Sequence, residues 1–204
     1  MAPVTILDYG GNIRSVERAC QAAGMRASVS SDPAIVACAE RIILPGVGHA
    51  GDVMRRLEST GLAEAVRMVV RRGAPVLGIC VGAQLLLDRS EEGDTTCFGF
   101  IEGTARKMPQ LHVAWAPCMV VRHHVVLNRS ADVYFTHGYD LHPEQPMARV
   151  AESAHGAVPF CCAIGRDNVL GLLFHPEKSG AAGVEVLRRF GEWQPPLAKL
   201  RGER

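Results

Sequence analysis

The N-terminal half of this chain alternates short apolar runs with amphipathic stretches, and this alternation limits the folds that it can adopt. Apolar runs rich in branched aliphatic side chains occupy residues 4–7, 41–44 and 75–79, with a weaker run at 27–29. Between them, hydrophobic side chains recur every three or four residues, as on one face of a helix. The alternation predicts a doubly wound α/β fold, in which helices flank a central, mostly parallel sheet.

The expected helices begin and end at characteristic residues. Asn12 is a candidate N-cap for a helix that Gly24 closes, and Pro33 suits the first turn of a shorter helix. Two further helical patterns cover residues 50–58 and 61–72. Each strand predicted in this half is therefore followed by a helical segment.

Three loops of this half are candidates for a shared binding site. Ligands of doubly wound sheets bind beyond the carboxyl ends of the strands. The loops at residues 8–12 and 45–48, and the turn around Cys80, all directly follow predicted strands. We therefore expect these three segments to converge on one crevice.

The pattern changes in the C-terminal half, where short apolar runs are separated by turns. Strands are expected at residues 97–101, 119–121, 133–136, 148–152, 160–164 and 169–174, followed by a helix over 179–192. Successive strands without helices between them favour antiparallel pairing. We expect antiparallel strands added to the same sheet, one domain over residues 1–193, and a frayed tail at 194–204.

Composition excludes several classes of protein. A length of 204 residues suits one domain, and a net charge of +1 gives no broad basic surface for nucleic acid. Apolar runs all fall short of the ~20 residues of a membrane span, and the N-terminus has no signal-peptide pattern. Seven irregularly spaced cysteines, without an export signal, favour reduced thiols in the cytoplasm. No C-x-x-C pair occurs, so no metal site is expected.

The segment around Cys80 is a candidate nucleophile turn. The apolar run at 75–79 stops abruptly at Gly-Ile-Cys-Val-Gly, and a helical pattern follows at Ala83. Gly78 and Gly82 allow the backbone to pack closely around a strained turn residue, and a helix N-terminus favours a thiolate. The alternative is a buried structural cysteine, since free cysteines are among the most buried residues.

A second segment supplies a base and a carboxylate to orient it. The apolar run at 169–174 leads to His175, and Pro176 biases that histidine towards extended backbone. Residues two apart in an extended chain point to the same side, so Glu177 can reach the imidazole of His175. With Cys80, these residues form a Cys-His-Glu triad. The alternative is an ordinary histidine at a strand end, because the chain holds eight.

A thiol nucleophile also requires N–H groups that stabilise an oxyanion. The backbone N–H of Val81, directly after the nucleophile, is one candidate. The segment Pro45-Gly46-Val47-Gly48 offers another at Val47, because glycines on both sides free the orientation of the peptide. A plain loop is the alternative for that segment.

Together these motifs resemble those of a known enzyme family. Residues 78–84 are similar to the nucleophile motif of class I (triad) glutamine amidotransferases, and residues 174–177 are similar to its His/Glu motif. Other stretches resemble the glutaminase subunits of imidazole glycerol phosphate synthase, the HisH subunits: residues 8–12, 44–48, 134–139 and 175–180. The resemblance covers residues 4–192.

This resemblance implies a mechanism. Cys80 would attack the amide carbon of L-glutamine, His175 would transfer the proton, and Glu177 would orient His175. Ammonia would leave, and water would hydrolyse the γ-glutamyl thioester to glutamate. Val47 and Val81 would supply the oxyanion N–H groups, and neither a cofactor nor a metal is implied.

The resemblance also implies substrate contacts and a partner. Gly48 and Gln84 would line the glutamine pocket. The ammonia would pass to a cyclase subunit with a (β/α)₈ barrel, HisF, in a 1:1 heterodimer. That cyclase makes imidazole glycerol phosphate and an aminoimidazole carboxamide ribotide in histidine biosynthesis. The surface that faces it would include Asn12, Trp115 and Lys178.

Departures from the family pattern leave alternatives open. His-Val-Ala-Trp-Ala at residues 112–116 replaces the usual His-Met-Gly-Trp-Asn, the 8–12 loop is one residue shorter, and Gly138 replaces Ser or Thr. The chain could therefore be a paralogue that supplies ammonia to an enzyme of surface-sugar biosynthesis. A non-catalytic docking subunit, and a free-standing γ-glutamyl hydrolase or cysteine peptidase, are further alternatives.

Overall fold

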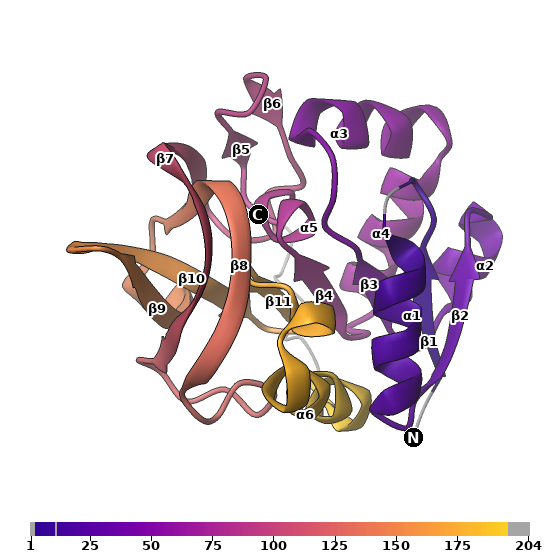
Figure 1. The fold of residues 1–204 in the computed structure, drawn as a ribbon. Coiled ribbons are helices and arrows are strands. Elements are labelled where there is room, and N and C mark those ends of the chain that lie inside the picture. The colour runs from indigo at the N-terminus through magenta and orange to yellow at the C-terminus, as the bar shows by residue number, and fades with distance from the viewer. Residues whose placement is uncertain (1–2, 11, 196–204) are drawn as a thin grey trace.

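The computed structural model describes residues 3–10 and 12–195, and its strands build one large mixed sheet flanked by helices (Figure 1). The N-terminal half supplies four parallel strands: β1 (Pro3–Leu7), β2 (Arg26–Ser30), β3 (Ile42–Leu44) and β4 (Val76–Ile79). They lie in the order β2-β1-β3-β4. β3 and β4 are buried along their whole length, as is typical of parallel strands covered on both faces.

Helices cover both faces of this half. α1 (Ile13–Ala22) contacts α6 (Gly180–Glu192), and α2 (Pro33–Cys38) packs against α4 (Leu62–Arg71), which follows α3 (Ala50–Ser59). Right-handed crossovers place α1 and α2 on opposite faces, since β2 and β3 flank β1 on its two sides. The helices expected before Cys80 are confirmed. Asn12 precedes α1, but its side chain accepts a hydrogen bond from Ser15 rather than from a backbone N–H.

The C-terminal half extends the sheet. β11 (Val169–Leu172) lies parallel to β4, and β10 (Val158–Arg166) and β9 (Arg149–His155) follow it in antiparallel pairing. β9 pairs with β7 (Gly103–Val120), which forms a long hairpin with β8 (Ala131–Pro143), at the left of Figure 1. The short strands β5 (Arg89–Ser90) and β6 (Thr95–Thr96) complete the sheet. The single-turn 3₁₀ helices η1 (Pro146–Ala148) and η2 (Pro176–Lys178) lie between strands and before α6.

The predicted strand lengths in this half are wrong in two places. Residues 119 and 120 of the run at 119–121 end β7, and the run at 133–136 is part of β8; these strands have 18 and 13 residues. One face of this hairpin is exposed, so most of its residues are partly or fully exposed, and the strands do not read as continuous apolar runs. Residues 97–101 form no strand, because their N–H groups donate to carbonyls at 85–88 instead.

The helix predicted after Cys80 is much shorter than its sequence pattern. α5 spans only Val81–Gln84, and the N–H groups of Leu86 and Leu87 donate to carbonyls three residues earlier. The apolar run of Leu85, Leu86 and Leu87 is fully buried in the core. Burial, rather than a long helix, therefore accounts for this run.

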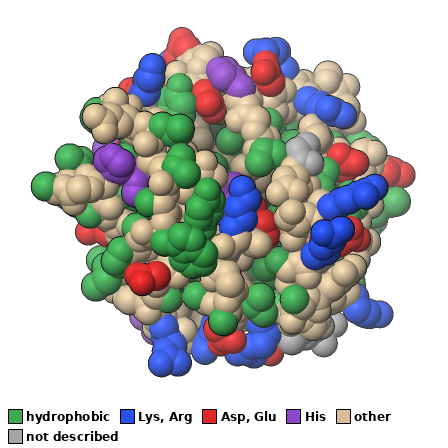
Figure 2. Space-filling view, in the orientation of Figure 1, with side chains coloured by type: hydrophobic (Ala, Val, Ile, Leu, Met, Phe, Trp, Pro, Cys, Tyr) green, Lys and Arg blue, Asp and Glu red, His purple; other side chains and the backbone are tan. Residues whose placement is uncertain are grey.

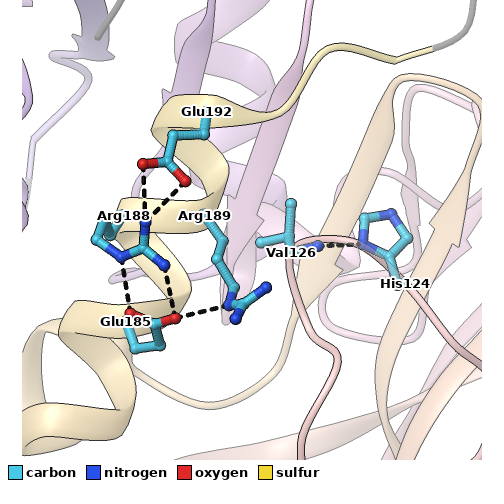
Figure 3. Close-up of polar contacts among 6 residues, drawn as sticks. All are labelled: His124, Val126, Glu185, Arg188, Arg189 and Glu192. Carbon is cyan, nitrogen blue, oxygen red and sulfur yellow. Dashed lines mark hydrogen bonds and ion pairs between the residues drawn. The ribbon is translucent and has the colours of Figure 1, made fainter.

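Helix α6 carries a row of ion pairs on its exposed face (Figure 3). Arg188 bonds both Glu185 and Glu192, and Arg189 also bonds Glu185, at 2.7–2.8 Å. Pairs spaced three and four residues apart support a helix by a few tenths of a kcal/mol each, roughly. Buried Arg41 donates to the carbonyls of Phe190 and Trp193 and so holds the C-terminal end of this helix.

Other expectations concern the termini, the cysteines and membranes. Most of the tail predicted to fray, residues 196–204, lies outside the described residues, and the domain boundary at 193 stays a prediction. All seven cysteines are free thiols, and of these only Cys38 is exposed. No helix within residues 3–10 and 12–195 is long and apolar enough to span a membrane.

Candidate active site

Cys80 occupies a strained turn between β4 and α5. Its backbone has φ 49° and ψ −105°, a conformation that is uncommon for any residue with a side chain. A Cβ at position 78 would lie 2.4 Å from the carbonyl oxygen of Gly82, and one at position 82 would lie 2.2 Å from that of Leu44. The close packing around this turn therefore requires glycine at positions 78 and 82, two residues before and after Cys80, as the sequence predicted.

The thiol of Cys80 faces strand β8. Its Sγ donates a weak hydrogen bond to the carbonyl of Thr136 at 3.7 Å, and its backbone N–H donates to Leu172 of β11 at 2.7 Å. The residue is 5% exposed. The thiol is thus held at the carboxyl end of the parallel strands, where the sequence places the crevice.

His175 and Glu177 lie side by side just beyond β11. The Nδ1 atom of His175 lies 2.7 Å from Oε1 of Glu177, and both side chains are almost fully buried. His175 has extended backbone, but the residues after it form η2, so the contact arises from a tight turn rather than from the extended chain expected. Nε2 of His175 has no hydrogen-bond partner among the described residues, which leaves it free for a group in the crevice.

The surroundings of His175 favour its protonated form. Burial lowers the pKa of this histidine, but the neighbouring Cys80 and Glu177 outweigh that effect and raise it to about 9. A negative charge on either neighbour stabilises the imidazolium. The arrangement therefore suits a thiolate–imidazolium pair.

A cleft of about 510 Å³ gathers most of the predicted site residues. Its walls include Val47, Gly48, Cys80, Val81, Gln84, His175 and Lys178. The backbone N–H groups of Val47 and Val81, the predicted oxyanion donors, make no hydrogen bond with any described residue. Tyr9 donates to the carbonyl of Pro45 and anchors the loop that carries Val47.

Thr136, His137 and Tyr139, from the family-like stretch at 134–139, also line this cleft, and sequence reasoning gave them no role there. Glu92 lines it too and was missed altogether. Oε2 of Glu92 accepts from the N–H of Ala50 at 2.8 Å, and its own N–H donates to the hydroxyl of Ser90. The same hydroxyl donates to Gln84 at 2.9 Å. Glu92 lies in a polar turn that no local pattern distinguishes from a solvated loop.

Two of the residues predicted to face a partner, Trp115 and Lys178, lie beside the same tyrosine, and the third, Asn12, precedes α1, which contacts the η2 turn that holds Lys178. Trp115 is 56% exposed and packs edge-on against Tyr134, and the ammonium of Lys178 lies 5.5 Å from the centre of the Tyr134 ring. Leu111 and Val113 are also exposed on β7, and Figure 2 shows hydrophobic side chains gathered where this hairpin runs. Asn12 is exposed before α1.

The site offers no evident metal centre. No group of three or more His, Cys, Asp or Glu side chains suited to a metal ion occurs in the part of the chain that the structure describes. The thiol, the imidazole and the backbone N–H groups of the cleft form an arrangement suited to acyl transfer through a thioester.

Comparisons with known proteins agree with this chemistry. The chain matches the model of the family "Glutamine amidotransferase class-I" over residues 5–192. Its fold is similar to a crystal structure of a glutamine amidotransferase, with a TM-score of 0.76 and 20% identity over 93% of this chain and 97% of the other. It is also similar to the structure of PurLQS from Thermotoga maritima, with a TM-score of 0.71, 20% identity, and 93% and 98% coverage.

Curated relatives are more similar in sequence. The imidazole glycerol phosphate synthase subunit HisH of Dechloromonas aromatica is 39% identical, over 94% of this chain and 97% of the relative. The HisH subunit of Geobacter sulfurreducens is also 39% identical, over 94% and 99% of the two chains. The chain therefore belongs to the class I glutamine amidotransferase family and, within it, to the HisH subunits of imidazole glycerol phosphate synthase.

Proposed function

We propose that this chain is the glutaminase subunit of imidazole glycerol phosphate synthase and that it works in the cytoplasm. It hydrolyses L-glutamine to glutamate and ammonia and passes the ammonia to a cyclase subunit, for histidine biosynthesis. The observation that carries the proposal is the cleft itself, in which the strained Cys80 lies beside a His175 held by Glu177.

The first half of the reaction releases ammonia. The sulfur of Cys80 attacks the side-chain amide carbon of glutamine, and the N–H groups of Val47 and Val81 stabilise the resulting oxyanion. The C–N bond then breaks as Nε2 of His175 donates its proton to the leaving nitrogen. The products of this half are ammonia and a γ-glutamyl thioester on Cys80.

The second half releases glutamate. A water molecule gives a proton to Nε2 of His175 and attacks the thioester carbon, and the C–S bond breaks. The sulfur leaves as a thiolate that the imidazolium stabilises. The charge of Glu177 keeps the ring oriented in both halves, since Nδ1 remains bonded to it.

The other residues of the cleft select the substrate. Gln84 and the backbone of Gly48 lie beside Cys80 in its wall, and Glu92 adds a negative charge. We assign Glu92 to the α-ammonium group of glutamine, because one of its oxygens bonds Ala50 and the other remains available. The Ser90 hydroxyl bonds both the N–H of Glu92 and the side chain of Gln84, so it fixes these two residues relative to each other.

The partner would dock on the rim of the cleft. Trp115 and Lys178 at this rim, with Asn12 at the start of α1, are the residues assigned to the interface with a HisF cyclase of (β/α)₈ fold, in a 1:1 complex. Tryptophan is enriched among the residues that dominate the energy of an interface, and Trp115 is exposed. The HisH relatives match nearly the full chain, which favours this partner over a sugar-modifying enzyme.

The test is glutaminase activity with and without the cyclase subunit and its nucleotide substrate. We expect slow ammonia release from this chain alone, a large increase in the complex, and no release from Cys80→Ala. Wild-type ammonia release by Cys80→Ala would overturn the triad assignment. A chain that is inert even in the complex would instead support the non-catalytic docking alternative.

A further inference from the structure

Ser179 carries a hydroxyl that bonds the catalytic loop instead of the helix that it precedes. It is the residue before α6, a position where serine normally accepts a hydrogen bond from the first turn. Here the side chain makes no such bond. The residue is 2% exposed, and α6 has its own ion pairs along the exposed face (Figure 3).

The hydroxyl links two backbone groups that belong to different elements. It donates to the carbonyl of His175 at 2.6 Å and accepts from the N–H of Tyr134 in β8 at 3.0 Å. The N–H of His175 donates directly to the carbonyl of Tyr134 at 3.0 Å. The backbones of Tyr134 and His175 are thus joined twice, once by a direct hydrogen bond and once through the hydroxyl of Ser179.

Strand β8 also holds the nucleophile. Thr136, two residues after Tyr134 on the same strand, accepts the weak hydrogen bond from the thiol of Cys80 at 3.7 Å. One strand therefore contacts both members of the proposed thiolate–imidazolium pair. The hydroxyl of Ser179 connects the carbonyl of His175 to the N–H of Tyr134 in this strand.

We propose that Ser179 is a positioning residue that sets the distance between His175 and Cys80. The proposal rests on the function assigned above. Without the hydroxyl, the N–H of Tyr134 loses its partner, whereas the carbonyl of His175 keeps its bond from the N–H of Lys178 at 3.0 Å. The backbone that joins Tyr134 to His175 must therefore shift to give the Tyr134 N–H a new partner. A shift of about 1 Å can reduce catalysis roughly 100-fold when reacting groups must be aligned.

The first measurement separates kcat from KM in glutamine hydrolysis by the complex with the cyclase. We expect Ser179→Ala to lower kcat by about 10- to 100-fold and to change KM by less than about 2-fold, since proton transfer contributes factors of this size. Ser153→Ala is the matched control, because Ser153 is also buried and its hydroxyl has no hydrogen-bond partner among the described residues. We expect that control to keep wild-type constants.

The second measurement follows the thiol directly and needs no glutaminase activity. The rate at which iodoacetamide alkylates Cys80 is measured against pH by mass spectrometry of its peptide, in a Cys38→Ser background that removes the exposed thiol. If the imidazolium of His175 stabilises the thiolate, alkylation persists below the usual thiol range. We expect Ser179→Ala to move the midpoint upward by at least about 0.5 pH unit.

These readouts distinguish positioning from simple support of α6. Lower stability with an unchanged kcat and an unchanged alkylation profile would overturn the proposal. If Ser179→Ala does not fold, Ser179→Cys decides with the same two measurements, because a thiol is a weaker donor and acceptor. The two proposals can also fail separately. If the wild-type protein has no glutaminase activity but Ser179→Ala still shifts the alkylation profile of Cys80, the proposed function is contradicted and the positioning role of Ser179 stands.

Discussion

The Nδ1 atom of His175 lies 2.7 Å from Oε1 of Glu177, and the two side chains are 1% and 3% exposed. An ionised carboxylate can only accept a hydrogen bond, so the histidine carries a proton on Nδ1. Its Nε2 is then the atom that exchanges a proton in the cleft. One buried contact therefore fixes which ring nitrogen can act.

Replacing Glu177 by glutamine tests this contact. Glu177→Gln keeps the shape but removes a charge that helps to raise the pKa of His175 to about 9. The imidazolium is then lost at lower pH, so the alkaline limb of the pH–rate profile moves down. We expect kcat to fall by roughly 10- to 100-fold.

The control for that variant is Glu192→Gln, which removes a carboxylate paired with Arg188 on the exposed face of α6 (Figure 3). We expect its kcat and pH profile to match the wild type. An alkaline limb that stays in place in Glu177→Gln would show that this carboxylate does not tune His175.

Replacing a glycine of the Cys80 turn by alanine should strongly lower the stability of the protein. Gly82→Ala places a Cβ 2.2 Å from the carbonyl oxygen of Leu44, whereas a Cβ at Gly138 meets nothing closer than 3.9 Å. We expect Gly82→Ala to lower the free energy of unfolding by about 2 kcal/mol or more, and Gly138→Ala to change it by less than about 0.5 kcal/mol. Urea denaturation measures both, and equal stabilities would contradict the packing described around Cys80.

The assignment of Glu92 predicts a change in binding rather than in chemistry. Glu92→Gln still accepts from the N–H of Ala50 but no longer offers a negative charge to the α-ammonium group of glutamine. We expect KM to rise about 10- to 100-fold with little change in kcat, the size of a lost charge-assisted hydrogen bond. Glu91→Gln is the control, because Glu91 bonds Lys107 outside the cleft. A normal KM in Glu92→Gln would remove this residue from the substrate site.

Because His137 is buried, we expect the free energy of unfolding to fall in acid. Burial is the largest of the effects that lower its pKa, to about 4, whereas an unfolded chain has a histidine pKa of about 6.5. Between these values the unfolded chain binds a proton that the folded protein does not. The free energy of unfolding should therefore be fully retained above pH 6.5 and fall by roughly 3 kcal/mol as pH drops through 4.

His137→Phe tests this source of acid sensitivity, since the side chain packs among Phe135, Phe160 and His112. The variant should lose less stability than the wild type between pH 7 and pH 4.5, measured by urea denaturation. The same loss in both proteins would exclude His137 as its cause.

Local patterns in the sequence predicted the parts of the site that depend on neighbouring residues. The glycines around Cys80 permit a closely packed turn, and Pro176 restricts the backbone of His175, so both local geometries can be predicted from neighbouring residues. The parallel half of the sheet was predicted for the same reason, because its buried strands are continuous apolar runs.

Other parts depend on contacts between distant segments. Glu92 enters the cleft because its turn bonds the start of α3, 42 residues away. The hydroxyl of Ser179 reaches β8, 45 residues away, and so its sequence position suggests only a helix cap. The length of β7 was hidden because its exposed face carries polar residues. The length of α5 was overestimated because the leucines that follow it are buried in the core without continuing the helix.

The most direct test of the central claim is to trap the intermediate on Cys80. The complex of this chain with the cyclase subunit is mixed with isotopically labelled L-glutamine, quenched in acid within one turnover, and digested for mass spectrometry. We predict a labelled γ-glutamyl group on the peptide that contains Cys80, and none in Cys80→Ser. Glutamine hydrolysis at the wild-type rate without label on Cys80, or with label on another residue, would contradict the account.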